Sequence, residues 1–451
     1  MKTIVIGGIA AGMSTASKLK RLAPNEHIIV VERGEETSYG ACGLPYYISG
    51  VNPVEDLLRI RKADVFRQAG IDLRLRCEVT GVDAENRRVT VKNLVTDDEV
   101  TESYDCLVAA SGADSIMPSF ENRDLGGIFT LKTIADANRI KQELTEEVKN
   151  IAVIGGGNIG LEMVESFLEL GRNVALFEQA PRLLPGFDSE ISGSLFDFLV
   201  GKGVKIHLGK AVTGFEGKGR LQAVRSGAGH IPADLALVAV GVRPNTGFLV
   251  GSGIKMLPNG AILVNEYMES SIPGIYAAGD CASVFHRILK KQMYMPLATN
   301  ANKQGRYIAE NIMGNRRRYI TALGTFMIKV CEMELAKTGI SEGEAQTHSI
   351  PCLSICIDGP NRAPYYPGGT MIKIKLVFCP GSGKLLGAQL MGGQGAALRI
   401  NTLAACITAG MTVEEIGELD FGYAPPYAMP WDVIHVAANM AQAKFEKNKS
   451  G

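Results

Sequence analysis

One compact pattern occurs twice in this chain, and it constrains the fold more than any other feature. In the first copy, a short apolar strand from Thr3 to Ile6 leads into G-G-I-A-A-G, Gly7 to Gly12. A helical pattern follows from Met13 to Leu22, and a second strand, His27 to Val31, ends at Glu32. Strand, glycine turn, helix, strand and terminal acid together predict a Rossmann dinucleotide-binding unit.

The small residues of this first turn have separate roles. Gly7 permits the tight turn, and Gly12 lets the helix pack closely against the strand. The helix N-terminus offers free N–H groups to a pyrophosphate, and Glu32 is placed to accept hydrogen bonds from ribose hydroxyls. The middle glycine of the motif is replaced by Ile9, so this copy departs from the full pattern.

The second copy matches the motif fully. Its parts are a strand over Ile151 to Ile154, the turn G-G-G-N-I-G with Gly155, Gly157 and Gly160, a helix over Leu161 to Leu170, and a strand over Asn173 to Phe177. The acid at its end, Glu178, favours NAD(H) because a carboxylate repels a 2′-phosphate. Arg182 lies close enough in the chain to leave NADP(H) open.

Three more segments run from a strand into a turn. They are Tyr104 to Ala113, Asp234 to Asn245 and Ser271 to Asp280. An acid at a strand end, as at Asp280, can bind a flavin ribityl hydroxyl or, through water, the phosphate region. An ordinary turn or helix-cap aspartate is the alternative reading.

Cys42 is the main candidate for chemistry. It lies in S-Y-G-A-C-G-L-P-Y-Y, shortly after the first fingerprint, and the next cysteine is Cys77. Its oxidised form is therefore expected to be something other than a disulfide to a near neighbour. A helix is predicted to start near Leu44-Pro45, which would lower the pKa of the thiol. A buried, inert thiol is the alternative.

Composition excludes several other classes. Lys+Arg and Asp+Glu both number 47, so the net charge is zero, which argues against a sequence-independent nucleic-acid binder. The nine cysteines are irregularly spaced, as expected of reduced cytoplasmic thiols rather than of a disulfide framework. No apolar run reaches the roughly 18 residues of a membrane span. We therefore expect a soluble, cytoplasmic protein of two or three domains.

With these motifs, the chain resembles the flavoprotein disulfide reductases with two dinucleotide-binding domains. The resemblance rests on both fingerprints and on I-Y-A-A-G-D ending at Asp280. Glutathione-reductase-like members carry C-x-x-x-x-C, whereas Tyr47 stands at the sixth position here. A-C-G-L-P-Y-Y, P-Y-Y-P-G-G (Pro364 to Gly369) and Y-A-P-P-Y (Tyr423 to Tyr427) are similar to the single-cysteine subgroup. That subgroup contains CoA-disulfide reductases, NADH oxidases, NADH peroxidases and NADH-dependent persulfide reductases.

The resemblance implies an α/β fold with an FAD domain interrupted by an NAD domain, followed by a C-terminal α+β dimerisation domain. The expected boundaries are 1–118, 119–245, 246–320 and 321–451. The chain agrees, because flavin-type motifs flank the second fingerprint. After about Thr321 the pattern changes to strands over Thr325 to Cys331 and Met371 to Phe378, then a helix over Gly395 to Ala409.

The implied cofactors are FAD and NADH, with NADPH and CoA as further candidates, in a homodimer acting on a small-molecule sulfur substrate. Glu162 resembles the family glutamate near the nicotinamide, with a helix-surface acid as the alternative. The expected cofactor-binding residues are Gly7, Gly8, Ala10, Ala11, Gly12, Glu32, Arg33, Ser111, Gly112, Gly155, Gly157, Gly160, Glu162, Glu178, Gly241 and Asp280.

The expected catalytic residues are Cys42, Tyr365 and Tyr423, with Tyr366 and Tyr427 as alternates. In the CoA-disulfide and persulfide branch, such tyrosines come from the partner subunit. A phenol near the thiolate can protonate a leaving thiolate or steady a mixed disulfide. Packing of the dimer interface is the alternative role for these tyrosines.

Ala10 helps to decide which electron acceptor is expected. NADH oxidases and peroxidases of the group usually carry a histidine there as an acid–base partner, so this chain looks more like the CoA-disulfide and persulfide branch. The tail departs from the CoA-disulfide reductase pattern at Trp431 and His435, and a packed interface histidine is expected there. Binding of CoA would need cations for its phosphates. Six basic residues either form such a pocket or belong to a solvated basic face: Lys18, Lys20, Arg21, Arg59, Arg61 and Lys62.

In the predicted reaction, hydride passes from NADH to FAD, and the reduced flavin then delivers electrons to oxidised Cys42. The resulting Cys42 thiolate attacks a disulfide, persulfide or polysulfide. A water- or peroxide-forming NADH oxidase is the alternative enzyme. A ferredoxin or rubredoxin reductase, which uses only the flavin, is an alternative of another class.

Overall fold

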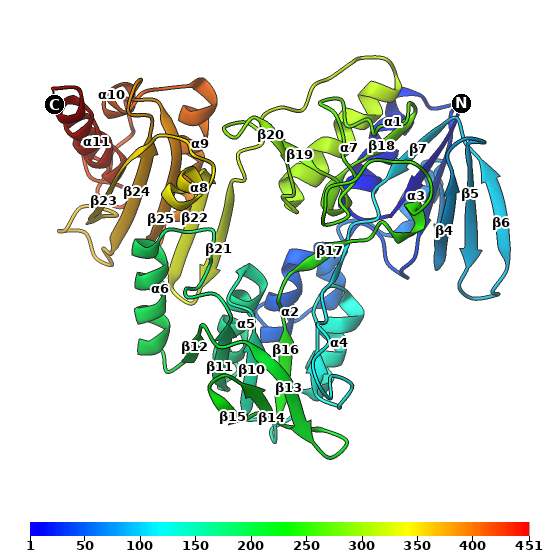
Figure 1. Ribbon diagram of the computed structural model, residues 1–451, viewed down its shortest axis with the longest axis horizontal. Coiled ribbons are helices and arrows are strands. Elements are labelled where there is room, and N and C mark those ends of the chain that lie inside the picture. Colours follow the sequence, from blue (N-terminus) through cyan, green and yellow to red (C-terminus); the bar gives the residue numbers. More distant parts are fainter. Residues whose placement is uncertain (451) are drawn as a thin grey trace. The chain divides into compact units, whose positions relative to one another are not determined.

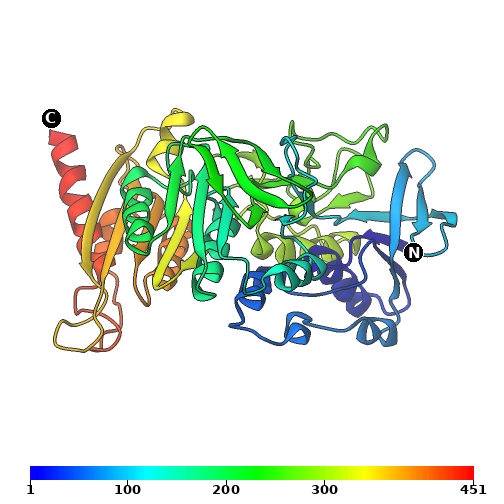
Figure 2. The same cartoon turned by 90° about the horizontal axis from the view of Figure 1, so that it is seen from below.

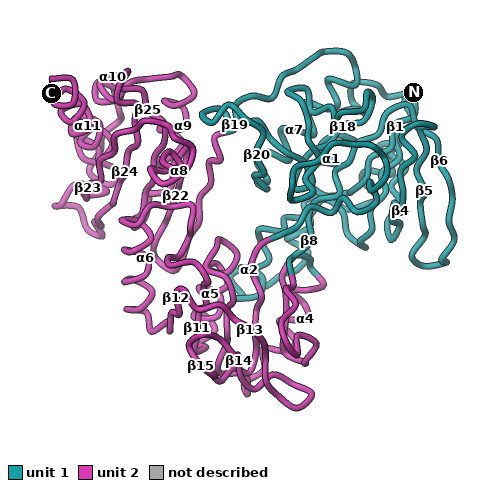
Figure 3. The backbone as a smooth tube through the Cα atoms, viewed as in Figure 1, with its two compact units in different colours: residues 1–116, 132–134, 242–322 teal, residues 117–131, 135–241, 323–451 magenta. Residues whose placement is uncertain are grey.

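A computed structural model describes residues 1–450, whose contacts divide the chain into two compact units (Figure 3). Unit 1 consists of residues 1–116, 132–134 and 242–322. Unit 2 consists of residues 117–131, 135–241 and the chain from residue 323 onward. Unit 1 is thus interrupted in sequence by part of unit 2. The division into the four expected domain segments stays a prediction.

Unit 1 is built on a five-stranded parallel sheet of order β18-β7-β1-β2-β3 (Figure 1). The strands are β1 (Lys2–Ile6), β2 (His27–Glu32), β3 (Asp72–Leu75), β7 (Cys106–Ala109) and β18 (Ile275–Ala277). In the central register Ile4 lies beside Ile29 and Leu107, and all three side chains are fully buried. Buried parallel strands read as continuous apolar runs, which is why β1, β2, β7 and β18 were predictable from the sequence, whereas β3, with the sequence D-L-R-L, was not.

Two helices of unit 1 pack against each other beside this sheet: α1 (Ala10–Leu22) and α7 (Ala298–Ile312) (Figure 1). A Cβ built on Gly305 would lie 2.3 Å from the Ala11 carbonyl oxygen, so only glycine allows the helices to approach this closely. The other helical elements are η1 (Ala41–Gly43), α2 (Leu44–Ser49), η2 (Glu55–Leu58), α3 (Ala63–Gln68), η3 (Gly247–Leu249) and η4 (Gly279–Cys281). The other strands form the antiparallel sheet β4 (Cys77–Asp83), β5 (Arg88–Asn93) and β6 (Glu99–Ser103), and the pairs β8 (Ala113–Ser115) with β17 (Val242–Pro244) and β19 (Val284–His286) with β20 (Lys291–Met293).

The first part of unit 2 repeats the Rossmann arrangement, with a parallel sheet of order β12-β11-β10-β16-β9. Its strands are β9 (Ile128–Phe129), β10 (Asn150–Ile154), β11 (Asn173–Glu178), β12 (Lys205–Leu208) and β16 (Leu235–Val238). The helices are α4 (Ile134–Glu143), α5 (Asn158–Glu169) and α6 (Ser189–Gly201), and a small sheet contains β13 (Val212–Gly217), β14 (Leu221–Ser226) and β15 (Gly229–Pro232).

The C-terminal part of unit 2 is an antiparallel sheet of order β21-β22-β25-β24-β23. Its strands are β21 (Phe326–Val330), β22 (Met333–Gly339), β23 (Leu353–Pro360), β24 (Met371–Phe378) and β25 (Leu385–Gly392). The helices are α8 (Glu342–Thr347), α9 (Ile400–Ala409), α10 (Val413–Gly417) and α11 (Val433–Ser450). Helix α11 lies against β23 and β24 (Figure 2), where Ala441 and Phe445 are buried with Phe378.

The α/β fold class is confirmed, and the predicted strands and helices are found with small shifts at their ends. Helix α1 begins at Ala10 rather than at Met13, and α5 begins at Asn158 rather than at Leu161. The helix predicted over Gly395 to Ala409 is found as α9 from Ile400 onward, and the 3-10 turn η5 (Ala397–Arg399) precedes it. Gly395 itself has φ of +88°, which is outside the right-handed helical region. Among residues 1–450, no helix combines the length and apolar character that a membrane crossing requires.

Candidate active site

The first fingerprint forms a tightly packed turn between β1 and α1. Gly7 has φ of +104°, and a Cβ there would lie 2.1 Å from the Ala110 carbonyl oxygen. A Cβ on Gly12 would lie 1.8 Å from the Gly7 carbonyl oxygen, so any side chain would push the helix away from the turn. No side chain caps α1 at Ile9, which leaves the N–H groups of its first turn available. The turn therefore fits a dinucleotide pyrophosphate.

The second fingerprint repeats this geometry at β10 and α5. Gly155 has φ of +113°, and a Cβ on Gly160 would lie 1.9 Å from the Gly155 carbonyl oxygen. Around the middle glycine, Gly157, a Cβ would meet no atom within 4 Å. This open space at the helix N-terminus is what a pyrophosphate needs in order to approach the backbone closely.

The two strand-end acids make matching hydrogen bonds. Glu32 accepts one from the Gly8 N–H (2.6 Å) and one from the Gly34 N–H (2.7 Å). Glu178 accepts one from the Gly156 N–H (2.7 Å) and one from the Ala180 N–H (2.7 Å). A carboxylate has about four acceptor positions, so each acid braces its own glycine turn and keeps capacity for ribose hydroxyls.

The other predicted cofactor-binding residues of unit 1 lie at the ends of β7, β2 and β18. The Ser111 hydroxyl donates to the Asn245 carbonyl (2.5 Å), and Gly112, which follows it, has φ of +69°. Arg33 pairs with Asp114 at 2.6 Å. In unit 2, Gly241 has φ of +116° after β16.

Asp280, in η4 after β18, pairs with Lys132 at 3.1 Å. Sequence reasoning missed Lys132, because the two residues are 148 positions apart and no local motif surrounds the lysine. A cation beside Asp280 limits how much of that carboxylate is free to bind a ribityl hydroxyl.

Cys42 is exposed, in the 3-10 turn η1 that runs directly into α2. Helix α2 begins at Leu44 with proline in its first turn, as predicted. The segment before the cysteine is tied to the flavin-type fingerprint, because the Thr37 hydroxyl (2.5 Å) and the Ser38 N–H (3.0 Å) both donate to the Gly8 carbonyl. Cys42 therefore lies only a few residues along the chain from a segment that is hydrogen-bonded to the turn predicted to bind FAD.

The rest of the Cys42 turn is held from the other side. The Gly40 N–H donates to the Leu58 carbonyl (2.8 Å), and a Cβ on Gly43 would lie 2.7 Å from the Leu58 Cδ2. None of the nine cysteines, all of which lie within residues 1–450, takes part in a disulfide. Oxidation of Cys42 within this chain would thus join it to an external sulfur or oxygen.

The two predicted catalytic tyrosines are brought together in unit 2. The hydroxyl oxygens of Tyr365 and Tyr423 lie 2.7 Å apart, although the residues are 58 positions apart in sequence. Both side chains are exposed, at 74% and 44%. The hydrogen bond to Tyr365 raises the pKa of Tyr423, because the bond favours the protonated phenol. The alternates Tyr366 and Tyr427 are exposed as well, and neither joins this pair.

His435 is a packed residue, as the sequence analysis favoured. It is only 5% exposed and stacks on Phe421, with 4.3 Å between ring centroids. Its Nε2 lies 2.7 Å from the Leu419 carbonyl oxygen. Trp431 meets the histidine edge-on and is itself 61% exposed. The histidine therefore supports an exposed tryptophan.

Glu162 lies on α5, in the first helical turns after the second fingerprint. Burial, with a smaller contribution from the carboxylate of Glu165, raises the pKa of Glu162 to about 7. Glu165 is 3% exposed and pairs with Lys329 of β21. No local motif indicates this ion pair, because it joins residues 164 positions apart.

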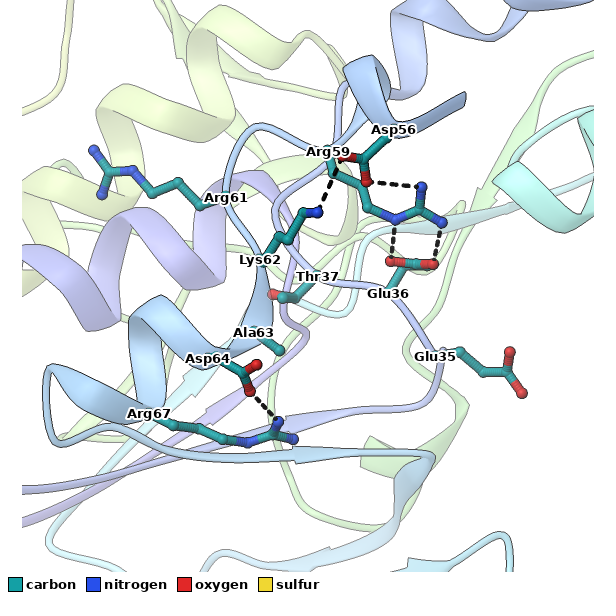
Figure 4. A pocket seen from close by; sticks show the side chains of 10 residues that line it. All are labelled: Glu35, Glu36, Thr37, Asp56, Arg59, Arg61, Lys62, Ala63, Asp64 and Arg67. Atoms are coloured by element: carbon teal, nitrogen blue, oxygen red, sulfur yellow. Dashed lines mark hydrogen bonds and ion pairs between the residues drawn. The ribbon is translucent and has the colours of Figure 1, made fainter. Parts of the chain in front are cut away.

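The basic cluster predicted around Arg59 is neutralised by carboxylates (Figure 4). Arg59 donates to Glu36 (2.9 and 2.5 Å) and to Glu55 (2.6 Å), and these bonds raise its pKa. Lys62 pairs with Asp56 at 3.1 Å. Arg61 is exposed, makes none of the ion pairs found within residues 1–450, and points away from the others (Figure 4).

The basic residues on α1 differ in the same way. Lys18 pairs with Glu310 at 3.4 Å, and the Lys20 ammonium donates to the Glu26 carbonyl at 3.1 Å. Arg21 is exposed on the last turn of the helix. The six cations therefore do not form one uncompensated patch.

Comparison with known proteins defines the class. Residues 1–305 match the family model for pyridine nucleotide-disulphide oxidoreductases, and residues 325–433 match the model for the dimerisation domain of these enzymes. The chain belongs to this family and is therefore an oxidoreductase. Membership implies FAD and a pyridine nucleotide as cofactors.

Individual relatives narrow the comparison. The chain is 36% identical over 439 residues to the NAD(P)H sulfur oxidoreductase (CoA-dependent) of Pyrococcus abyssi, covering 97% of both chains. It is 34% identical over 448 residues to an NADH oxidase of Methanocaldococcus jannaschii, covering 99% of both. Among solved structures, an NAD-dependent persulfide reductase from A. fulgidus superposes with a TM-score of 0.96 at 34% identity, covering 99% of this chain and 84% of that one.

Proposed function

We propose that this protein uses NAD(P)H and FAD to reduce a low-molecular-weight disulfide, persulfide or polysulfide through Cys42. CoA disulfide and CoA persulfide are the foremost candidate substrates. The observation that carries the proposal is the exposed thiol whose segment is hydrogen-bonded to the flavin-type fingerprint through Thr37 and Ser38. The relatives named as sulfur and persulfide reductases support the same class of substrate.

The two glycine turns bind the cofactors in this proposal. The turn at Gly7, braced by Glu32, takes FAD, and the turn at Gly155, braced by Glu178, takes the pyridine nucleotide. The carboxylate of Glu178 favours NADH, since it would repel the 2′-phosphate of NADPH. FAD, when bound, supplies two electrons that it has taken as hydride from NAD(P)H.

Cys42 performs the sulfur chemistry. Its thiolate attacks one sulfur of the substrate, forming a new S–S bond to Cys42 as the substrate S–S bond breaks. One substrate half leaves as a thiolate and takes a proton. Two electrons then cleave the Cys42 adduct, which restores the Cys42 thiolate and releases the second half as a thiol. With a persulfide the adduct is a Cys42 persulfide, and the second product is hydrosulfide.

The tyrosine pair supplies the proton. Tyr365 and Tyr423 hold a phenolic proton between two oxygens 2.7 Å apart, exposed where a leaving thiolate can reach it. The hydrogen bond between the two phenols raises the pKa of Tyr423, so that phenol stays protonated to higher pH. With the dimerisation domain, we infer a homodimer in which the tyrosine pair of one copy serves Cys42 of the other.

For CoA substrates, the phosphate-binding cations are narrowed to Arg61 and Arg21. Both are exposed, and neither takes part in the ion pairs found over residues 1–450 that neutralise Arg59 and Lys62. Each charge-assisted contact to phosphate would contribute about 1.5–3 kcal/mol.

A second candidate function is NADH oxidation by oxygen, which the relative named NADH oxidase favours. Ala10 opposes it, because no imidazole stands in the first fingerprint to manage the protons of a peroxide. The oxygen reaction is therefore expected to be slow beside sulfur reduction.

The test is the Cys42→Ser variant, reconstituted with FAD and assayed without oxygen. NADH turnover is measured with CoA disulfide, CoA persulfide, polysulfide and ferricyanide. We expect all sulfur reduction to be lost while ferricyanide, which takes electrons directly from the flavin, is still reduced. Normal sulfur reduction by this variant would overturn the proposal and would favour a reductase that uses only the flavin.

Cys379→Ser provides the matched control. Burial alone would raise the pKa of Cys379, but hydrogen bonds from Ser382 and Gly381 outweigh it and lower the pKa overall. Cys379 is thus a partly exposed, activated thiol outside the proposed site. Its replacement is expected to leave the rate of reduction of every acceptor unchanged. The comparison shows whether activity depends on a thiol at position 42 or on reactive thiols in general.

A further inference from the structure

Arg399 lies at a junction of three backbone segments in the C-terminal part of unit 2. It is the last residue of η5, immediately before α9. Its guanidinium donates to Oδ2 of Asp432 from Nη2 (2.7 Å) and from Nε (2.9 Å), and Nε also reaches Oδ1 at 3.2 Å. Its Nη1 donates to the Gly395 carbonyl at 2.9 Å. Both partners of the ion pair are shielded from water, with side chains 13% and 8% exposed.

The same guanidinium reaches the two segments that carry the tyrosine pair. Its Nη2 donates to the Asn361 carbonyl at 3.0 Å and to the Tyr427 carbonyl at 3.2 Å. Asn361 starts the segment that contains Tyr365, and Tyr427 ends the segment that starts with Tyr423. One planar group therefore touches the backbone of both.

The segment with Tyr365 is closed at its base. The Asn361 N–H donates to the Thr370 carbonyl at 2.8 Å, and the Thr370 N–H returns a bond to the Asn361 side-chain oxygen at 2.8 Å. Beyond Arg399, the Ala363 N–H to Pro425 carbonyl bond, at 3.3 Å, also joins the two segments. Arg399 is a charged and shielded part of this junction, and its charge-assisted hydrogen bonds are stronger than bonds between neutral groups, so it helps to hold the two segments in register.

The tyrosines need such external support. Their side chains are exposed, and a hydrogen bond between two surface phenols does not fix the loops on which they stand. The 2.7 Å separation of the hydroxyls therefore depends on how the segments at Asn361 and Tyr427 are placed.

We propose that Arg399 is a positioning residue, which together with Asp432 sets the distance between the hydroxyls of Tyr365 and Tyr423 and so enables proton delivery. This inference rests on the proposed function. The requirement is geometric as well as electrostatic, because a guanidinium presents its donors in a rigid fork, whereas a lysine ammonium is a single point charge.

The test uses Arg399→Lys, which keeps the charge, in the full-length enzyme with FAD. We expect kcat for CoA disulfide to fall roughly tenfold to hundredfold, less than for complete loss of a general acid, because both phenols remain but are misplaced. Ferricyanide reduction should stay unchanged. Asp432→Asn is a second variant: asparagine still caps α11, where the Ile434 N–H binds the Asp432 side chain at 3.0 Å, but it is neutral and has a single acceptor oxygen, so the ion pair with the arginine is lost.

A double-mutant cycle with Tyr423→Phe separates positioning from general loss of structure. If Arg399 acts through the tyrosine pair, adding Arg399→Lys to Tyr423→Phe causes little further loss of kcat. Fold losses that multiply would overturn the inference, as would an equal loss of ferricyanide turnover. Lys373→Met, which breaks the Lys373–Asp358 pair of the same sheet, is the control and should act like the unmodified enzyme.

The cycle also distinguishes the two levels of the argument. If Tyr423→Phe alone has normal kcat, the proposed role of the tyrosines fails. If Tyr423→Phe is impaired and Arg399→Lys is normal, the tyrosine role stands and the positioning role of Arg399 is refuted.

Discussion

Replacing Tyr423 by phenylalanine removes one hydroxyl of the tyrosine pair and leaves the ring in place. Within residues 1–450, this hydroxyl forms its hydrogen bond with that of Tyr365, 2.7 Å away, and both side chains are exposed. The hydroxyl left behind can bind water, so no buried polar group loses its partner. We therefore expect the thermal midpoint of unfolding and the FAD content to stay unchanged.

Activity should respond very differently. A positioned general acid typically contributes roughly 100-fold or more, so kcat with a sulfur acceptor should fall by about that factor in Tyr423→Phe. Ferricyanide reduction needs no proton from the pair and should be unaffected. The combination of a large activity loss with unchanged stability follows directly from the exposure of the pair.

The same pair predicts a pH effect through Tyr365→Phe. The hydrogen bond between the two hydroxyls raises the pKa of Tyr423, so the catalytic phenol stays protonated to higher pH in the unmodified enzyme. Without that bond the pKa of Tyr423 falls back toward its ordinary value of about 10. The alkaline limb of kcat should therefore move to lower pH.

The assay is steady-state kcat for CoA disulfide against pH, beside a thermal melt of each variant. Tyr366→Phe and Tyr427→Phe are matched controls, since both residues are exposed tyrosines of the same two segments outside the pair. Equal losses in these controls, or an alkaline limb that stays in place in Tyr365→Phe, would refute the reasoning.

Three further variants test other parts of the structure. Lys375, 2% exposed, pairs with Glu190 and Glu342 at 2.7 Å; Lys375→Met should lower the free energy of unfolding by about 3–5 kcal/mol, and a urea titration matching that of the unmodified protein would be inconsistent with this. The rate of flavin reduction by NADH should rise as pH increases through about 7, where Glu162 ionises, and Glu162→Gln should abolish that rise in stopped-flow measurements. Glu178→Ala should raise KM for NADH more than KM for NADPH in steady-state assays, and an unchanged KM ratio would argue against its role in cofactor choice.

The parallel-sheet units were predictable because their signals are local. Gly7 and Gly12 are five residues apart and must both lack a side chain, since a Cβ at either would overlap a carbonyl oxygen. The start of α1 was less visible. Ala10, Ala11 and Gly12 carry no apolar periodicity, so the pattern indicated a helix only from Met13, whereas the backbone is helical from Ala10.

The candidate site was predictable only where a motif identified it. Tyr365 and Tyr423 were found through their motifs, yet nothing local showed that their hydroxyls meet. Lys132 and Arg399 were missed, because their partners lie 148 and 33 residues away.

The cations of the segment around Arg59 were recognised from the sequence, but the carboxylates that neutralise them were not. Carboxylates of Glu36 and Glu55 fold back onto Arg59 and bind its guanidinium. Counting cations along a segment therefore overestimates the charge that remains for a ligand, because the folded chain brings acids to them.

The most direct test of the central claim is the mass of the peptide that contains Cys42. The enzyme is incubated without oxygen with CoA disulfide or CoA persulfide, analysed, and then treated with NADH. We predict a CoA adduct with the first substrate, or about 32 Da of added sulfur with the second, on Cys42 and lost after NADH. An unmodified Cys42 during active turnover, or an adduct confined to another cysteine, would contradict the account.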